Sequence, residues 1–223
     1  MDIKFFKLQN KTLVMIDWAN VYGWFKSLKW EIDPQKLYDY LTSYEEIKKV
    51  AFYYGKEIGN IKSEEFQKKI KNIGYDLKSK EVKFVPIFLN QQLYLKETFK
   101  NIFNLIDNLI KDEDCKAITK LNVFKKKLQE EFKKPILRRK CDFDTEFARD
   151  IYNNINDFET LIIFSGDGDY APLVDDLIKK NKKVIVVFAR GHRGKEYGLL
   201  KKKPFLCRID RIKQYIIKNI PKE

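Results

Sequence analysis

Continuous apolar runs alternate with amphipathic segments along most of this chain, and this alternation restricts the fold more than any other feature. Unbroken apolar runs are typical of strands that are buried on both faces. Repeated strand–helix alternation therefore predicts an α/β fold, with a mainly parallel sheet between two layers of helices. We expect strands at residues 11–18, 47–55, 134–143, 159–166 and 182–189, a strand or hairpin at 75–87, and helices at 20–28, 33–44, 62–74, 144–155, 169–181 and 210–220.

The alternation stops between residues 91 and 134. There, "ETFKNIFNLIDNLI" and "ITKLNVFKKKLQEEF" repeat apolar residues at helical spacing, which predicts two successive helices. No Pro/Gly-rich linker, internal repeat or low-complexity tract divides the chain. We therefore expect one domain over residues 1–223, with a helical insertion at about 91–134.

The net charge of +13 favours a polyanionic partner, such as nucleic acid or an anionic membrane surface. A lysine-rich, alanine-poor composition also fits a protein from an AT-rich genome. No apolar run approaches the roughly 18 residues of a membrane span, and the first 20 residues do not resemble a signal peptide. Cys115, Cys141 and Cys207 are too widely spaced for a CxxC metal pair or a disulfide framework. We expect a cytoplasmic protein without a membrane partner.

Acidic residues follow three of the predicted strands. The first strand ends at Asp17, with Asn20 three residues later, the third ends near Asp142 and Asp144, and "LIIFSG" is followed by Asp167 and Asp169. In an open parallel sheet, ligands bind beyond the carboxyl ends of the strands. Acids from separate parts of the chain are therefore expected to gather at one edge.

Neighbouring carboxylates repel one another or take up protons unless a cation lies between them. Mg²⁺ suits such a cluster, because it accepts a few carboxylates and completes its shell with water and phosphate. Two such ions about 4 Å apart would support phosphodiester cleavage. The glycines in "GDGD" allow a tight turn, and the following helix presents N–H groups to the acids or to a phosphate.

Each acid also has a structural alternative. Taken alone, Asp169 and Asp144 would each more often be the N-cap of the helix that follows than a metal ligand. Asp142 and Asp144 share one face of a regular strand, so alternation does not separate them, and Asp144 is preferred because it is nearer the strand-to-helix turn. Asp150 lies about 1.7 helical turns after Asp144, and a solvated or ion-paired Asp150 fits as well as one at the rim of the site.

Three stretches resemble the NYN domain of the PIN-like nuclease superfamily, in the branch close to the LabA-like proteins. They are "VMIDWANVY", "KCDFDTEFARD" and "LIIFSGDGDYAPLVDDLIKKNKKVIVV", in this order, and "ARGHRGKE" resembles the segment that follows the last strand in related proteins. The resemblance covers most of residues 11–217 outside the insertion. It implies a PIN-like three-layer α/β/α fold and metal-dependent ribonuclease activity with Mg²⁺ or Mn²⁺.

The resemblance also implies roles for particular residues. The metal-binding and catalytic acids fall on Asp17, Asp144, Asp167 and Asp169, with Asn20 as their polar partner. Asp144 matches better than Asp142, because "TEFARD" preserves the family's step to a second aspartate at Asp150. Trp18 departs from the family, in which a small residue, often glycine, is common at this place.

Several neighbouring residues have less defined roles. Ser165 either orients an acid or a water, or only bonds the backbone. His192, the single histidine, is favoured as a loop or substrate-contact residue over a catalytic one. Arg190, Arg193 and Lys195 either hold phosphate or form a solvated basic loop.

The end of the insertion and the strand after it are strongly basic. Residues 116–140 contain ten basic and two acidic residues, and Leu121, Phe124 and Leu128 form an apolar stripe at helical spacing. We expect this stripe to fix the helix to the body and its lysines to face outward, as a wall that guides RNA toward Asp144. A solvated lysine-rich helix is the alternative. The predicted RNA-binding residues here are Lys125, Lys126, Lys127, Arg138, Arg139 and Lys140.

The leading hypothesis is thus a metal-dependent ribonuclease with RNA as its partner. A non-catalytic RNA-binding module on the same fold is the alternative, and a homodimer is left open. A phosphatase or nucleotide hydrolase of another α/β class is disfavoured: Asp17 has no second aspartate two residues later, and no GxxxxGK[ST] motif occurs.

Overall fold

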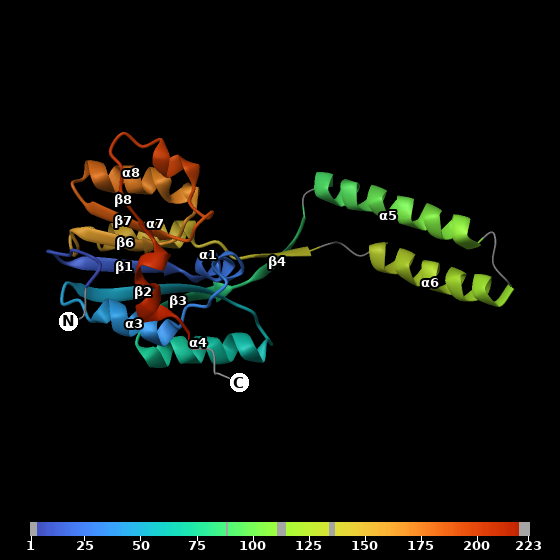
Figure 1. Ribbon diagram of the computed structural model, residues 1–223, viewed down its shortest axis with the longest axis horizontal. Coiled ribbons are helices and arrows are strands. Elements are labelled where there is room, and N and C mark those ends of the chain that lie inside the picture. The colour runs from blue at the N-terminus through green and yellow to red at the C-terminus, as the bar shows by residue number, and fades with distance from the viewer. Residues whose placement is uncertain (1–3, 88, 111–114, 134–136, 219–223) are drawn as a thin grey trace. The chain divides into compact units, whose positions relative to one another are not determined.

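The computed structural model describes residues 4–87, 89–110, 115–133 and 137–218, and its central feature is a six-stranded sheet (Figure 1). All neighbouring strands in this sheet run parallel, so the predicted α/β class is confirmed. The strands are β1 (Thr12–Asp17), β2 (Ile47–Lys56), β3 (Asp76–Glu81), β6 (Thr160–Phe164), β7 (Lys183–Phe188) and β8 (Phe205–Arg208), in the spatial order β3-β2-β1-β6-β7-β8.

This order changes direction between β1 and β6. From β1 the chain builds outward through β2 and β3, and it then returns to the other side of β1 to add β6, β7 and β8. Such a reversal leaves a crevice at the carboxyl ends of the two central strands, where doubly wound sheets bind their ligands. The topology therefore makes the ends of β1 and β6 the expected place for a ligand site.

Helices cover both faces of the sheet, because successive residues of each strand point to opposite sides. Val14, Ile16 and Phe164 belong to one buried cluster, which α1–α4 and the C-terminal segment complete, whereas Met15 and Ile163 belong to a second cluster with α7 and α8. The helices of the two layers are α1 (Trp18–Gly23), α2 (Phe25–Leu28), α3 (Pro34–Thr42), α4 (Ile61–Ile73), α7 (Asp144–Asn153), α8 (Ala171–Lys179) and α9 (Lys213–Ile216), with 3-10 helices η1 (Gly168–Tyr170), η2 (Lys195–Gly198) and η3 (Ile209–Ile212).

The chain divides into two compact units. One comprises residues Met1–Glu81 and Cys141–Glu223, called the α/β unit below, and the other comprises Val82–Lys140, called the inserted unit. The inserted unit contains β4 (Lys83–Pro86), α5 (Leu89–Ile110), α6 (Cys115–Lys133) and β5 (Leu137–Lys140). Both helices expected in the insertion are therefore present. The interpretation of the whole chain as a single domain stays a prediction.

Two predictions of secondary structure need correction. The strand expected at residues 134–143 is not part of the parallel sheet, because β5 pairs antiparallel with β4 in a separate two-stranded sheet. The helix expected from residue 210 to 220 is preceded by a strand that the sequence did not reveal, β8, and only η3 and α9 are helical there. Residues 219 and 220 lie outside the described residues.

Within the inserted unit, an ion pair joins the two helices. The Lys125 ammonium donates to both carboxylate oxygens of Asp107 across α5 and α6. Lys126 and Lys127 are exposed, whereas Lys125 is half-buried. Phe124 is 53% exposed, so it does not pack like the half-buried Leu121 and Leu128 of the predicted stripe.

Candidate functional site

The end of β1 fixes Asp17 at the switch point of the sheet. Asp17 is the last residue of the strand and the N-cap of α1, where its Oδ1 accepts the backbone N–H of Asn20 at 3.2 Å. Trp18 is 5% exposed and packs against Phe52 and Phe66 at ring distances of 5.0 and 5.6 Å. The large residue that departs from the family pattern is thus accommodated as part of the core.

Asn20 joins the end of β1 to the loop after β6. Its side-chain oxygen accepts the backbone N–H of Gly166 at 3.0 Å and the indole N–H of Trp24 at 2.9 Å. These two bonds occupy the amide oxygen, which gives Asn20 a positioning role in this structure. Asn20 thereby fixes the position of the "SGDGD" loop relative to α1.

Ser165 lies between two of the acids. It is fully buried, and its hydroxyl lies 3.5 Å from Oδ2 of Asp17, to which it donates. The same hydroxyl accepts the backbone N–H of Asp167 at 3.3 Å. The contact with the Asp17 carboxylate supports the role of Ser165 in orienting an acid.

Asp167 and Asp169 begin the turn after β6. The Asp167 carboxylate caps η1 by accepting the backbone N–H of Asp169 at 3.1 Å. The hydroxyl of the buried Tyr197 donates to the Asp167 carbonyl at 2.6 Å, which fixes the loop from the other side. Asp167 is half-buried and Asp169 is exposed.

Asp144 reaches this region from α7 rather than from a strand of the main sheet. It is the first residue of α7, and its carboxylate interacts with the hydroxyl of Tyr170, a buried residue of η1. Partial burial raises the pKa of Asp144, and the charges of Asp142, Asp167 and Asp169 raise it further, while the Tyr170 hydroxyl lowers it.

Asp17 has a strongly raised pKa. Burial raises the pKa of Asp17 to about 6, and the negative charges of Asp167 and Asp144 add to the rise, against the hydrogen bond from Asn20. The four acids Asp17, Asp144, Asp167 and Asp169 therefore lie near enough for their charges to interact. We call this set the acid edge.

The acid edge has the donor chemistry of a site for a hard cation. Carboxylate oxygens are the ligands that Mg²⁺ and Mn²⁺ prefer, and the pKa of Asp17 is raised mainly by burial and further by the charges of Asp167 and Asp144. As the side chains stand, however, no three of the described His, Cys, Asp and Glu side chains converge closely enough to hold a metal. The donor type fits a cation, and binding would require the carboxylates to turn toward one another.

Two other predicted acids have different surroundings. The Asp150 carboxylate accepts the hydroxyl of Tyr53 at 2.8 Å and pairs with Arg149 at 3.1 Å, which accounts for it as a structural residue of α7. Asp142 is exposed and acts on the acid edge through its charge on Asp144.

The segment after β7 packs against the glycines of the "SGDGD" loop. A Cβ at Gly166 would collide with the backbone carbonyl of His192, and a Cβ at Gly168 would collide with the carboxylate of Glu196. The Gly194 N–H donates to the Gly166 carbonyl at 2.7 Å. Glu196 and the two tyrosines Tyr170 and Tyr197 are site neighbours that the sequence alone did not indicate.

His192 links this segment to α2. Its Nε2 lies 2.9 Å from the hydroxyl of Ser27, and its backbone packs against Gly166, so its observed contacts are with α2 and the "SGDGD" loop rather than with an acid. Arg190, Arg193 and Lys195 are exposed. Their predicted contact with phosphate stays a prediction.

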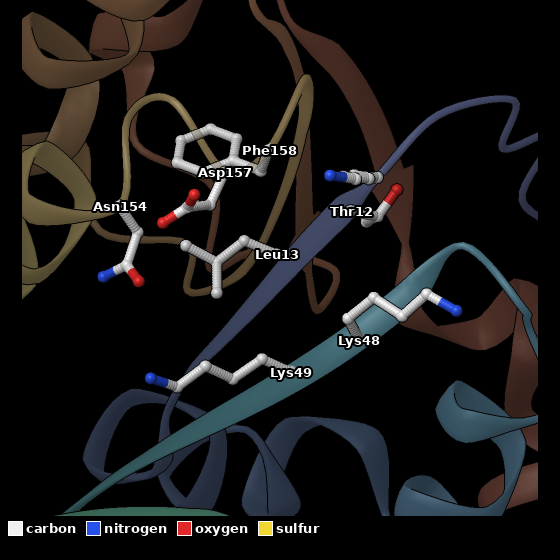
Figure 2. A pocket seen from close by; sticks show the side chains of 8 residues that line it. Thr12, Leu13, Lys48, Lys49, Asn154, Asp157 and Phe158 are labelled. Atoms are coloured by element: carbon white, nitrogen blue, oxygen red, sulfur yellow. The ribbon is translucent and has the colours of Figure 1, made fainter.

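A separate pocket lies at the amino edge of the sheet. It has a volume of about 210 Å³ and is bordered by the starts of β1 and β2 and by the α7–β6 connection (Figure 2). Figure 2 shows the Lys48 and Lys49 amino groups pointing in opposite directions, and Lys49 pairs with Asp76 at 2.9 Å. Small-molecule sites usually measure about 300–1,000 Å³. The acid edge is therefore the stronger candidate site.

The sequence profile of the NYN domain matches residues 90–203, about half of the chain. The chain belongs to the NYN-domain family. This is a family of the PIN-like nuclease superfamily, so the predicted family is confirmed, whereas the LabA-like branch stays a prediction. The matched stretch of this NYN-domain protein contains Asp144, Asp167 and Asp169 but not Asp17.

One similar solved structure is the crystal structure of a protein of unknown function, VPA0982, from Vibrio parahaemolyticus RIMD 2210633. It has a TM-score of 0.58 and 17% sequence identity, and the alignment covers 96% of this chain and 99% of that chain. At this identity the likeness supports the fold of the NYN-domain protein. No curated protein matches the sequence significantly. In the described part of the chain, no helix is both long and apolar enough to cross a membrane.

Proposed function

We propose that this NYN-domain protein is a metal-dependent ribonuclease that hydrolyses RNA phosphodiester bonds at the acid edge. The observation that carries the proposal is the joining of Asp17 and Asp167 through the buried Ser165 hydroxyl where the strand order reverses, with the charge of Asp144 acting on Asp17. Four carboxylates would repel the RNA backbone in the absence of a cation. A site for phosphodiesters built from these residues therefore needs Mg²⁺ or Mn²⁺.

The proposed ligands of the cation are Asp17, Asp144, Asp167 and Asp169. When bound, a divalent cation lowers the pKa of a water and offsets the charge of the phosphate. Ser165 holds the Asp17 carboxylate and the Asp167 backbone in register, and Asn20 fixes α1 to the loop that carries Asp167. Tyr170 orients Asp144. Arg190 and Arg193 hold the phosphates that flank the cleaved bond.

A non-catalytic RNA-binding module is the second candidate. It is favoured by the finding that no three described carboxylate, imidazole or thiol side chains converge at metal-binding distance. In such a module the basic residues would bind RNA and the acids would remain unneutralised. Proposals that accompany either candidate are a cytoplasmic location and a homodimer.

One experiment separates the two candidates. The purified chain is incubated with a panel of RNAs in Mg²⁺, in Mn²⁺ and in excess chelator, beside an Asp167→Asn variant. A ribonuclease cleaves RNA only with the metal, and the variant does not cleave. RNA binding without cleavage by the wild type in either metal supports the module, whereas equal cleavage by wild type and variant would point to a contaminating nuclease.

A further inference from the structure

Tyr22 exposes its ring on α1, the helix that begins directly after Asp17 of the acid edge. Its exposed fraction is 64%, against 42% for Tyr152, the next exposed tyrosine among the described residues. Its neighbour on the exposed face of α1 is Ala19, three residues earlier, which is too small to cover a ring. Single exposed apolar residues are common on protein surfaces. Exposure alone therefore assigns Tyr22 no role.

The support beneath Tyr22 distinguishes it from an ordinary surface residue. Its ring lies 5.2 Å from that of Phe25, and Phe25 lies edge-on to the buried Trp18 at 6.0 Å. Trp18 in turn packs on Phe52 of β2 at 5.0 Å. A continuous series of aromatic contacts thus runs from the core to the surface. Because these aromatic contacts already restrict the Tyr22 side chain, a ligand that binds to it costs little additional side-chain entropy.

The position of Tyr22 relative to the acid edge is also fixed. Asp17 caps α1, and Asn20 bonds the backbone of Gly166, so α1 moves as one piece with the loop that bears Asp167. Tyr22 is five residues after Asp17, or about 7.5 Å along a helix axis. Lys26, one further turn along, is exposed on the adjoining α2. Asp17 of the acid edge, the aromatic ring of Tyr22 and the cationic side chain of Lys26 therefore follow one another from the start of α1 into α2.

We propose that Tyr22 is the platform of a nucleobase-binding site, on which an unpaired base of the RNA stacks while a nearby phosphodiester lies at the acid edge. The site rests on the proposed function for the identity of its ligand. A base is the occupant because its π-face matches an exposed aromatic ring, and because the phosphates on either side of it suit a chain of net charge +13. Lys26 contacts one of these phosphates.

The test measures binding separately from cleavage. Fluorescence anisotropy gives the affinity of an Asp167→Asn chain, in Mg²⁺, for a labelled ten-nucleotide RNA and for ten copies that each lack one base. Adding Tyr22→Ala is expected to weaken binding of the intact RNA by about 5- to 150-fold, the range for removal of one base–aromatic stack. Tyr22→Phe keeps the π-face and is expected to stay within about twofold.

The copies lacking one base show whether the missing partner of Tyr22 is a base. For the Asp167→Asn chain, removing the base at one position is expected to cost about as much as Tyr22→Ala. In the Tyr22→Ala variant, removal of the same base is expected to cause no further loss of affinity. Tyr152→Ala, which truncates an exposed tyrosine of α7 that bonds Asp176, is the matched control and leaves the pattern unchanged.

Two results would overturn the base site. The first is an RNA affinity that Tyr22→Ala leaves unchanged. The second is a Tyr22→Ala variant whose affinity falls as much as that of the parent Asp167→Asn chain for every RNA that lacks one base. Failure of the proposed ribonuclease gives a different result, since wild type would not cleave any RNA while Tyr22 still affects binding. Circular dichroism of Tyr22→Ala identifies misfolding, and Tyr22→Trp then provides the second comparison, with affinity at or above that of the parent.

Discussion

The acid edge and the inserted unit carry opposite charge and are held in place by different means. At the acid edge, Asp17, Ser165 and Asp167 are tied together by backbone and hydroxyl hydrogen bonds over a core that is almost fully buried. In the inserted unit, Lys126 and Lys127 are exposed on α6, and an ion pair between Lys125 and Asp107 connects α5 and α6.

This difference leads us to expect separate roles for the acid edge and the inserted unit. Chemistry on a phosphodiester requires groups held within a fraction of an ångström, which burial and converging hydrogen bonds provide. Attraction of a polyanion requires only positive charge near its path, which flexible exposed lysines provide. We therefore expect substitutions at the acid edge to change turnover and substitutions in the inserted unit to change affinity.

The largest expected effect is on turnover. Asp167→Asn replaces a carboxylate of the acid edge by a neutral isostere, and we expect cleavage of RNA to fall by at least about 10²-fold. The affinity for RNA is expected to change far less, because no basic side chain is altered. Single-turnover cleavage assays and anisotropy measurements separate the two quantities.

Asp157→Asn is the matched control for that variant. It makes the same chemical change at the pocket of the amino edge, and cleavage should stay within about twofold of wild type. A comparable loss of cleavage in both variants would contradict the assignment of chemistry to the carboxyl edge.

The close packing of the "SGDGD" loop gives the next effect. In Gly166→Ala, the new methyl group meets the backbone carbonyl of His192, which has to move. We expect a loss of about 3 kcal/mol in the free energy of unfolding. Denaturant titration followed by tryptophan fluorescence measures this, because Trp18, Trp24 and Trp30 all belong to the α/β unit.

Gly23→Ala gives the comparison for Gly166→Ala. A Cβ at Gly23 meets no atom within 4 Å, so the same substitution at the end of α1 should be neutral or stabilising by up to about 1 kcal/mol. If Gly166→Ala is as stable as Gly23→Ala, the loop is not tightly packed against the segment after β7.

The charge of Asp17 predicts a pH-dependent effect in chelator. Because burial raises its pKa from 3.8 to about 6, the folded state holds the proton more tightly than the unfolded state, and stability falls as pH rises between these values. Asp17→Asn keeps the capping oxygen without the charge. Above pH 6 it should be more stable than wild type by at most about 3 kcal/mol.

Thermal or chemical unfolding at pH 4 and pH 8 tests this prediction. The advantage of Asp17→Asn should be small at pH 4, full at pH 8, and reduced or reversed at pH 8 when Mg²⁺ is added, since a bound cation stabilises only the wild type. An advantage that does not depend on pH would mean that the Asp17 charge is not the cause.

The elements with local signals were predictable from the sequence. Asp33 caps α3 with Pro34 as its first residue, and α4 ends at Gly74 in a left-handed conformation with φ of 112°, as the residue types indicate. The ends of β1 and β6 were predictable in the same way, because unbroken apolar runs stop at acids. The predicted positions of Asp17 and Asp167 depend on these signals.

The remaining features depend on contacts between distant residues. β5 forms a strand as expected, but its partner is β4, and Lys140 pairs with Lys83 across an insertion that no local pattern spans. Tyr197 reaches the carbonyl of Asp167, 30 residues away in the sequence. The pairing of Lys125 with Asp107 likewise depends on how α5 and α6 meet. Side-chain partners of this kind are determined by packing rather than by sequence spacing.

The smallest expected effect concerns the exposed lysines of the inserted unit. Because Lys125 is committed to Asp107, the sharper variant is Lys126→Ala with Lys127→Ala, rather than all three lysines. We expect weaker RNA binding across all sequences and a slope of log K against log salt that is shallower by about 0.7 for each phosphate that is no longer neutralised. Cleavage at saturating RNA should remain at the wild-type rate, since the acid edge is untouched.

Lys179→Ala with Lys180→Ala is the matched control, because it removes two positive charges at the C-terminal end of α8, where each lysine pairs with an aspartate four residues earlier. Affinity that falls equally in both double variants would indicate a response to net charge rather than a binding surface on α6. If the α6 variant keeps the wild-type affinity and salt slope, the inserted unit does not bind RNA, and its exposed Phe124 makes self-association the property to measure next by sedimentation.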